Sequence, residues 1–275
     1  MHCRLLALWG VYAEHIGKLA DTLCEASRRD FIAGELANFR EHNDGWGYAL
    51  AIRKAGSWSL AMYRSRRPMW EDEFLLPSQG RIYGIMHTRK ASRGTPKDCF
   101  SAHPFPLMLS DGSAAFVAQN GGISKEGAAV LLGSHWRPCL SEVSDTLLYA
   151  MLLAQYYAES RGSPPERLLK SLVRLHEEIR DKELSKRCAN TLVLMLSPND
   201  SIALAVVRAH YSSEKERYYD LYRVDLGGSL AYASSTVAEL LRRQGAVVER
   251  IESNSVIIHH MSSGEREGVL KQEIP

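Results

Sequence analysis

The sequence predicts an α+β fold built from strands, then helices, then strands again. Apolar residues make up 45% of the 275 residues and charged residues 24%, a balance that is ordinary for globular domains. Short apolar or alternating runs dominate both ends of the chain, whereas apolar residues recur at helical spacing within residues 124–182. Because strand–helix–strand alternations are few, this order favours α+β over a doubly wound parallel sheet.

The first part of the chain is predicted to form strands around one helix. Residues 3–9 are an apolar run that ends at Gly10, which indicates a buried strand. Apolar residues at helical spacing predict a helix over residues 16–28. A turn at residues 43–47 is followed by predicted strands at 47–53, 57–63, 81–88 and 114–118, with a hairpin turn at 54–56 and a loop at 92–106.

The second part contains the remaining predicted helices and the returning strands. Ser144 is a predicted N-cap, and Pro164-Pro165 separates two of the helices. Helices are predicted at 124–132, 144–160, 165–182 and 236–243, strands at 190–196, 201–208, 217–224, 246–251 and 255–260, and a loop at 136–139. Since we find neither a linker nor a repeat with a period of roughly 20–50 residues, we expect one domain over residues 1–275.

Composition and charge exclude several classes of protein. The formal net charge of +2 gives no support for binding to nucleic acid or to a membrane. The five cysteines are odd in number and lack CxxC spacing, which favours a reducing compartment over a disulfide framework or a zinc ribbon. With no evident signal peptide and no apolar run near the roughly 20 residues that span a bilayer, a cytoplasmic protein is expected. The histidines lack ligand spacing, so we expect neither a metal nor a cofactor.

Cys3 is the first residue that suggests chemistry. A free thiol titrates near 8.5 and an α-amino group near 7.7–8.0, so an amine on the same residue is a suitable base for the thiol at neutral pH. If Cys3 were the first residue, it would have the arrangement of an N-terminal nucleophile. The alternative is that Cys3 is an ordinary buried residue of an apolar strand.

Asn120 and Gly121 suggest a site for a developing oxyanion. A side-chain amide and a backbone N–H at a glycine are suitable donors, and losing one such donor costs roughly 10²–10³ in rate. Glycine also allows a substrate to approach the backbone closely. The alternative is that residues 120–122 only form a turn at the end of a strand.

Three further residues suggest recognition of an amino acid. Arg89, at the end of a predicted buried strand, is suited to a bidentate contact with a carboxylate, and Ser92 adds a hydroxyl donor. Asp145 is suited to an ammonium group, although an acid in the first turn of a helix also complements the helix dipole. Together Arg89 and Asp145 would bind a zwitterion while Cys3 and Asn120 act on its far end.

In combination, these blocks resemble the class II glutamine amidotransferase family of N-terminal-nucleophile hydrolases, in its stand-alone branch. The resemblance implies an αββα four-layer sandwich of two packed sheets flanked by helices. It implies that Cys3 attacks the γ-carboxamide of L-glutamine, that ammonia leaves, and that water hydrolyses a γ-glutamyl thioester. By resemblance, the matching residues are Cys3 as nucleophile, Asn120 and Gly121 as the oxyanion pair, His87, Thr88, Arg89 and Ser92 at the substrate carboxylate, and Asp145 at the amino group. The segments 43–47 and 103–105 are assigned to the architecture of the site.

The sequence departs from the family pattern in three ways. His2 stands between Met1 and Cys3, and while both residues are retained Cys3 has an amide nitrogen, which cannot act as the base. After the hydrolase-sized region we expect no room for the synthase domain that multi-domain members carry. Leu147 follows residues 144–146 where the family often has glutamate.

Three functional hypotheses therefore stay open. The first is a stand-alone glutaminase, with a synthase partner that would accept its ammonia. The second is a hydrolase of another γ-glutamyl amide or peptide, because Cys3-Arg4 and residues 44–47 resemble a branch that cleaves γ-glutamyl groups from larger molecules. The third is a glutamine-sensing module without turnover, which the retained Met1-His2 leader would favour.

Overall fold

The computed structural model describes residues 2–92, 94–133, 140–185, 187–212, 216–264 and 266–275. It divides into two compact units, which we describe separately. Unit 1 comprises Met1–Ala91, Lys97–Pro104 and Lys215–Ile251, and unit 2 comprises Ser92–Pro96, Phe105–Glu214 and Glu252–Pro275. The expectation of one domain over residues 1–275 stays a prediction.

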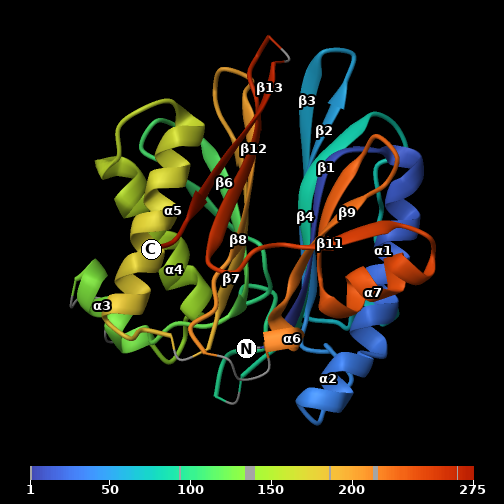
Figure 1. Ribbon diagram of the computed structural model, residues 1–275, viewed down its shortest axis with the longest axis horizontal. Coiled ribbons are helices and arrows are strands. Elements are labelled where there is room, and N and C mark those ends of the chain that lie inside the picture. The colour runs from blue at the N-terminus through green and yellow to red at the C-terminus, as the bar shows by residue number, and fades with distance from the viewer. Residues whose placement is uncertain (1, 93, 134–139, 186, 213–215, 265) are drawn as a thin grey trace. The chain divides into compact units, whose positions relative to one another are not determined.

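Unit 1 contains a seven-stranded sheet in the order β11-β9-β10-β1-β4-β2-β3 (Figure 1). Every neighbouring pair of strands in it is antiparallel. The strands are β1 (His2–Tyr12), β2 (Trp46–Lys54), β3 (Ser57–Ser65), β4 (Arg81–Lys90), β9 (Leu221–Asp225), β10 (Leu230–Ser234) and β11 (Val247–Arg250).

The helices of unit 1 cover one face of this sheet. The core there joins Leu6 and Leu8 of β1 to Leu19 of α1 and Leu241 of α7. Because successive strand residues point to opposite faces, Cys3 lies on the face away from these helices. The helical segments are α1 (Ala13–Arg28), α2 (Phe31–Leu36), a 3₁₀ turn (Met69–Glu71), α6 (Glu216–Tyr219) and α7 (Ser235–Arg243).

Unit 2 contains a six-stranded sheet in the order β13-β12-β8-β7-β6-β5, again antiparallel throughout. The strands are β5 (Phe105–Met108), β6 (Ala114–Gly121), β7 (Ala189–Leu196), β8 (Ile202–Arg208), β12 (Ser255–Met261) and β13 (Glu267–Glu273). The helices are α3 (Lys125–Leu132), α4 (Asp145–Glu159) and α5 (Pro164–Asp181).

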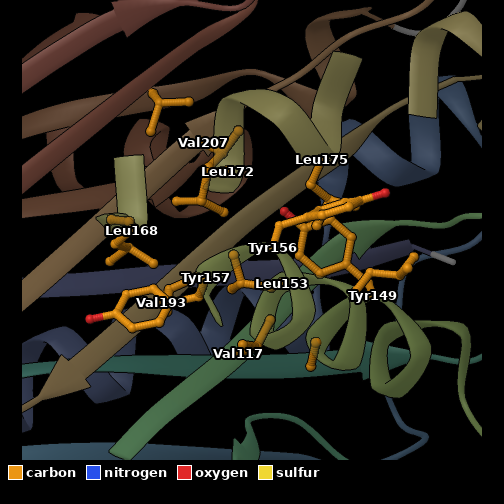
Figure 2. Packing of buried hydrophobic residues seen from close by; sticks show 14 of the residues in the cluster. Val117, Tyr149, Leu153, Tyr156, Tyr157, Leu168, Leu172, Leu175, Val193 and Val207 are labelled. Atoms are coloured by element: carbon orange, nitrogen blue, oxygen red, sulfur yellow. The ribbon is translucent and has the colours of Figure 1, made fainter. Parts of the chain in front are cut away.

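The core of unit 2 lies on the face of the sheet that carries α4 and α5. Figure 2 shows Leu153 of α4 and Leu172 of α5 gathered with Val117 and Val193 of the sheet. Val117 and Asn120 differ by three positions along β6, so their side chains point to opposite faces. Asn120 therefore lies on the face of its sheet away from α4 and α5.

The α+β prediction is confirmed, and most element predictions are correct to within a few residues. One predicted strand is partly wrong, because residues 217–219 belong to α6 and the strand starts at Leu221. The predicted loop at 92–106 already contains the start of β5 at Phe105. The sequence interpretation missed α2, β10 and β13, and the loop predicted at 136–139 lies outside the described residues. Among the described helices, none is long and apolar enough to cross a membrane.

Candidate active site

The pairing of β1 with β4 places Cys3 directly opposite Arg89 in unit 1. Leu5 is opposite His87 in the same register, so the side chains of Cys3, His87 and Arg89 share the helix-free face. Directly opposed side chains in an antiparallel pair start about 5 Å apart at their Cβ atoms. Cys3 and Arg89 are both fully buried. The candidate nucleophile and the candidate carboxylate-binding residue are therefore neighbours on one strand pair.

Thr88 is not brought together with these residues. It pairs with Arg4 of β1 and with Trp46 of β2, and Trp46 belongs to the core on the helix side. The side chain of Thr88 therefore points to the opposite face from Cys3 and Arg89.

A second segment holds the backbone on both sides of Arg89. The N–H of Asp44 donates to the carbonyl of Arg89 at 3.0 Å, and the N–H of Arg89 donates to the carbonyl of Gly45 at 2.8 Å. The Asp44 carboxylate also accepts from the N–H of Ala91 at 3.0 Å and lies 2.8 Å from Lys97 Nζ. Residues 43–45, which we call the Arg89 clamp, thus fix the end of β4.

His87 lies against His103, with ring centroids 4.1 Å apart, and both side chains are fully buried. Gly47 leaves room for this arrangement. A Cβ at Gly47 would lie 2.5 Å from the carbonyl oxygen of His103 and 2.4 Å from that of Tyr63. The segments 43–47 and 103–104 therefore meet next to the strand that carries His87 and Arg89.

In unit 2, Asn120 and Gly121 end β6 opposite Asn190 and Ala189 of β7, rather than forming a turn. Gly121 has a φ of 123°, which favours glycine, and a Cβ there would lie 2.1 Å from the carbonyl oxygen of Cys188. The Cys188 thiol donates to the carbonyl of Asn120 at 3.4 Å. Close packing against Cys188 thus sets the backbone of the candidate oxyanion pair.

Asp145 lies next to this strand end. Ser144 caps α4, and the Asp145 carboxylate accepts from the Ser144 hydroxyl and from the N–H of Ile123, each at 3.3 Å. A Cβ at Gly122 would lie 2.6 Å from Asp145 Oδ2. Burial raises the pKa of Asp145, although these hydrogen bonds oppose the shift. A bound ammonium group would favour the ionised carboxylate, so the site suits a cation.

Ser92 lies in unit 2, in a turn where its carbonyl accepts from the N–H and the hydroxyl of Thr95 at 3.1 and 2.7 Å. The candidate residues thus fall into two groups, each inside one unit. Cys3, His87 and Arg89 share a face in unit 1, and Asn120, Gly121 and Asp145 share a strand end in unit 2.

Two buried polar clusters escaped the sequence interpretation. In unit 1, Asp30 is fully buried and contacts Arg4 and His42. In unit 2, the rings of His176 and two tyrosines form a chain, with Tyr149 Oη 2.8 Å from Nε2 and Tyr211 Oη 2.7 Å from Nδ1. Burial lowers the pKa of His176 to about 3, so this histidine is neutral. The one available sequence signal was Asp30 in front of the apolar pair Phe31-Ile32, a typical N-cap position.

No group of three or more histidine, cysteine or acidic side chains among the described residues is arranged to hold a metal ion. The four cysteines of the described part of the chain, Cys3, Cys24, Cys99 and Cys188, form no disulfide with one another.

Two solved structures are similar to this chain along nearly its whole length. One is the glutamine phosphoribosylpyrophosphate amidotransferase from B. subtilis complexed with ADP and GMP, with a TM-score of 0.57 and 13% identity over 99% of this chain. The other, described as the allosteric regulatory enzyme of purine biosynthesis, has a TM-score of 0.59 and 14% identity over 99% of this chain. This chain spans about half the length of each, 49% in both cases. No family model and no curated protein matches the sequence.

These comparisons confirm the expected fold. The chain has two antiparallel sheets, each with its own helices, and its fold is similar to part of the solved glutamine phosphoribosylpyrophosphate amidotransferase.

Proposed function

We propose that this protein is a cysteine-dependent amidohydrolase that releases ammonia from L-glutamine. The observation that carries the proposal is the pairing of Cys3 with Arg89 on one buried face of the unit 1 sheet. A nucleophile next to a guanidinium is the arrangement that an amino-acid amide requires, since the carboxylate is held while the distant amide is attacked. The similarity in fold to a glutamine amidotransferase supports the same reaction class.

The reaction we propose has two steps. The thiolate of Cys3 attacks the γ-carbonyl carbon, the C–N bond breaks, and the nitrogen leaves as ammonia with the proton that came from the thiol. Water then attacks the γ-glutamyl thioester, glutamate leaves, and the sulfur regains a proton. The Asn120 amide and the Gly121 N–H are assigned to the oxyanion that forms in each step. Replacing Asn120 with alanine removes one donor.

Substrate recognition is assigned to two charged residues. Arg89 would bind the α-carboxylate, and the Arg89 clamp, which holds its backbone at 3.0 and 2.8 Å, supports a rigid contact. Asp145 would bind the α-ammonium group, because its buried carboxylate gains a counter-ion there. Ser92 and His87 are assigned supporting positions at the carboxylate, whereas the face on which Thr88 lies favours a structural role.

The base we propose is the α-amine of Cys3 after removal of the residues before it. His2 of β1 pairs with Lys90 of β4, so in the chain as given the nitrogen of Cys3 is an amide within a strand. The test compares a chain that starts at Cys3 with one that starts at Met1, by coupled measurement of ammonia from L-glutamine. Loss of the base should slow the longer chain by about 10²–10⁴-fold. Equal rates would contradict this assignment, and no ammonia from either chain, with glutamine binding retained, would favour the sensing hypothesis.

The leaving group defines the second candidate function. Cys3, Arg89 and Asp145 would contact only the γ-glutamyl half of the substrate, so a larger γ-glutamyl amide would use the same residues. Comparing kcat/KM for glutamine with that for a γ-glutamyl anilide decides the order of preference. A synthase partner that consumes the ammonia is a separate proposal, suggested by the solved amidotransferase, which is about twice as long as this chain.

A further inference from the structure

A single buried carboxylate in unit 1 joins segments that are far apart in the sequence. Asp30 is fully buried, and each of its oxygens accepts two hydrogen bonds. Oδ1 accepts from the N–H of Ala33 at 2.9 Å and from the hydroxyl of Thr236 at 2.6 Å. Oδ2 accepts from Nε of Arg4 and from Nε2 of His42, the latter at 2.6 Å. The carboxylate thus contacts β1, α2, the segment before β2 and α7.

Asp30 is ionised in this cluster. Burial alone would raise its pKa, but the charge of Arg4 and the hydrogen bonds from His42 and Arg4 outweigh burial and hold the pKa well below its usual range. Arg4 is itself fully buried, donates from Nη1 to the carbonyl of Tyr218 at 3.2 Å, and lies over the Tyr218 ring at 4.1 Å. Removing the Asp30 charge would therefore leave a buried guanidinium without its carboxylate.

The contact of Asp30 with Arg4, which we call the first arm of the cluster, leads to the nucleophile. Arg4 follows Cys3 in β1, and its side chain points to the helix face while that of Cys3 points to the other face. The next residue is also held, because the N–H of Leu5 donates to the Ser234 hydroxyl at 3.1 Å. The contacts of Arg4 on the helix side, and that of the Leu5 backbone with Ser234 of the neighbouring strand β10, thus fix the strand end that presents the thiol.

The contact of Asp30 with His42, which we call the second arm, leads to Arg89, the candidate carboxylate-binding residue. His42 immediately precedes the Arg89 clamp of residues 43–45, and its own N–H donates to the carbonyl of Ser27 at 2.7 Å. Since Asp44 and Gly45 hold both sides of the Arg89 peptide, a shift of His42 would be transmitted to Arg89 through two residues of backbone.

We propose that Asp30 is a positioning residue that sets both the nucleophile strand and the Arg89 clamp. Helix capping alone does not account for its contacts. An N-cap requires one oxygen on a backbone N–H, here that of Ala33, whereas Arg4 and His42 occupy the other oxygen. The kinetic consequences rest on the proposed function, whereas the mechanical coupling does not.

The experiment separates capping from positioning with Asp30→Ser, because serine caps helices as well as aspartate does. The double variant Arg4→Met with Asp30→Ser removes the unpaired charge if the single variant does not fold. The matched control is Ser163→Ala, which removes the N-cap of α5 in unit 2 and no contact of this cluster. Hydrogen exchange uses the full chain, and the kinetic measurements use chains that start at Cys3.

Hydrogen exchange gives the readout that is independent of activity. Asp30→Ser should exchange faster at residues 4–5, 44–45 and 89–91, while residues 19–23 within α1 keep their protection. Ser163→Ala should change none of these segments. If Asp30→Ser exchanges like the parent chain at residues 44–45 and 89–91, the proposal is wrong.

Kinetics provide the second readout. Asp30→Ser should lower kcat and raise KM for glutamine, with kcat/KM falling between about tenfold and 100-fold, because both arms move. His42→Gln should raise KM more than it lowers kcat, since it disturbs only the second arm. A loss shared equally by Asp30→Ser and Ser163→Ala would indicate general destabilisation and overturn the proposal. A parent chain that never releases ammonia would overturn the proposed function, and hydrogen exchange would still decide the role of Asp30.

Discussion

At the scale of single residues, two buried aspartates have carboxyl pKa values that are shifted in opposite directions. Asp30 has a charged partner in Arg4, and its pKa lies below the usual range. Asp145 has hydrogen bonds but its burial raises the pKa. A group with a lowered carboxyl pKa stabilises the fold at neutral pH, whereas one with a raised pKa destabilises it there. The second case is typical of a residue kept for its function rather than for stability.

This contrast predicts that Asp145→Asn stabilises the protein and abolishes glutamine binding. The folded state binds the Asp145 proton more tightly than the unfolded chain does, so the ionised carboxylate lowers the free energy of unfolding. Asp145→Asn should therefore raise the free energy of unfolding by its full amount above the raised pKa, and this gain should vanish as the pH falls to about 4 and below. We expect about 0.5–2 kcal/mol at pH 7, the usual size of a single stabilising substitution. Urea unfolding at pH 4 and pH 7 measures the gain, and calorimetric titration measures binding. A variant that is less stable at pH 7, or that binds glutamine normally, would contradict the assignment.

At the scale of elements, the end of β6 depends on a glycine that has no room for a side chain. Gly121 has a φ of 123°, and a Cβ would lie 2.1 Å from the Cys188 carbonyl oxygen. Gly56 in the β2–β3 turn also has a positive φ, 81°, but no heavy atom lies within 4 Å of a Cβ built there. Comparing alanine substitutions at these two glycines therefore separates the cost of backbone strain from the cost of a close contact.

Gly121→Ala should destabilise the protein by more than Gly56→Ala and should also remove activity. A positive φ at a non-glycine residue costs about 1 kcal/mol, which both variants share. Displacing the Cys188 carbonyl adds to this at Gly121 and moves Asn120, so kcat should fall by roughly 10²-fold or more. Thermal unfolding and ammonia release measure the two effects. Equal destabilisation by both variants would show that the Cys188 contact is readily relieved.

The same scale shows which features were predictable from sequence. The helices α4 and α5 were predicted because their apolar spacing is long and regular, and β1 because it is an apolar run that ends at Gly10. The six-residue α2 was missed because so short a segment has little periodicity. β13 was missed because its exposed pattern resembles a polar tail.

The candidate site was predictable only in part for a physical reason. The residue types at Cys3, Arg89, Asn120 and Asp145 point to chemistry in combination, whereas the face on which a strand residue lies depends on register. Thr88 illustrates this, because its pairing with Trp46 turns its side chain away from Arg89. The Asp30 cluster joins residues that are far apart along the chain. Asp30 and Thr236 are 206 positions apart, and no local sequence pattern encodes such a contact.

At the scale of the whole molecule, the two units repeat one design. Each has an antiparallel sheet with helices on one face, and each has candidate residues at a strand end on the other face, Cys3 and Arg89 in unit 1 and Asn120 in unit 2. Each also has a buried polar cluster on the helix side, with Asp30 in unit 1 and His176 in unit 2. Since hydrogen-bonded buried clusters give rigidity to their surroundings, we expect the helix layer of each unit to be rigid where its cluster lies.

The proposed recognition scheme predicts that L-glutamine stabilises the entire folded chain. A ligand that binds only the folded state adds RT ln(1 + [L]/Kd), or about 2.7 kcal/mol at 100 times Kd. The Cys3→Ala variant should show this stabilisation in full, since it binds glutamine without consuming it. Arg89→Met and Asp145→Asn, which alter one unit each, should both lose it, because the carboxylate and the ammonium group are each required.

Thermal unfolding over a glutamine series measures this effect, with D-glutamine as the control ligand. D-glutamine has the same charges in the mirror-image arrangement, so a shift with both enantiomers would indicate nonspecific binding. Stabilisation of the chain that starts at Cys3, without ammonia release from it, would identify a sensor, whereas stabilisation of Cys3→Ala together with hydrolysis by the chain that starts at Cys3 would identify an enzyme. A response that survives in Arg89→Met would contradict the recognition scheme, because no residue other than Arg89 is assigned a direct charge contact with the α-carboxylate.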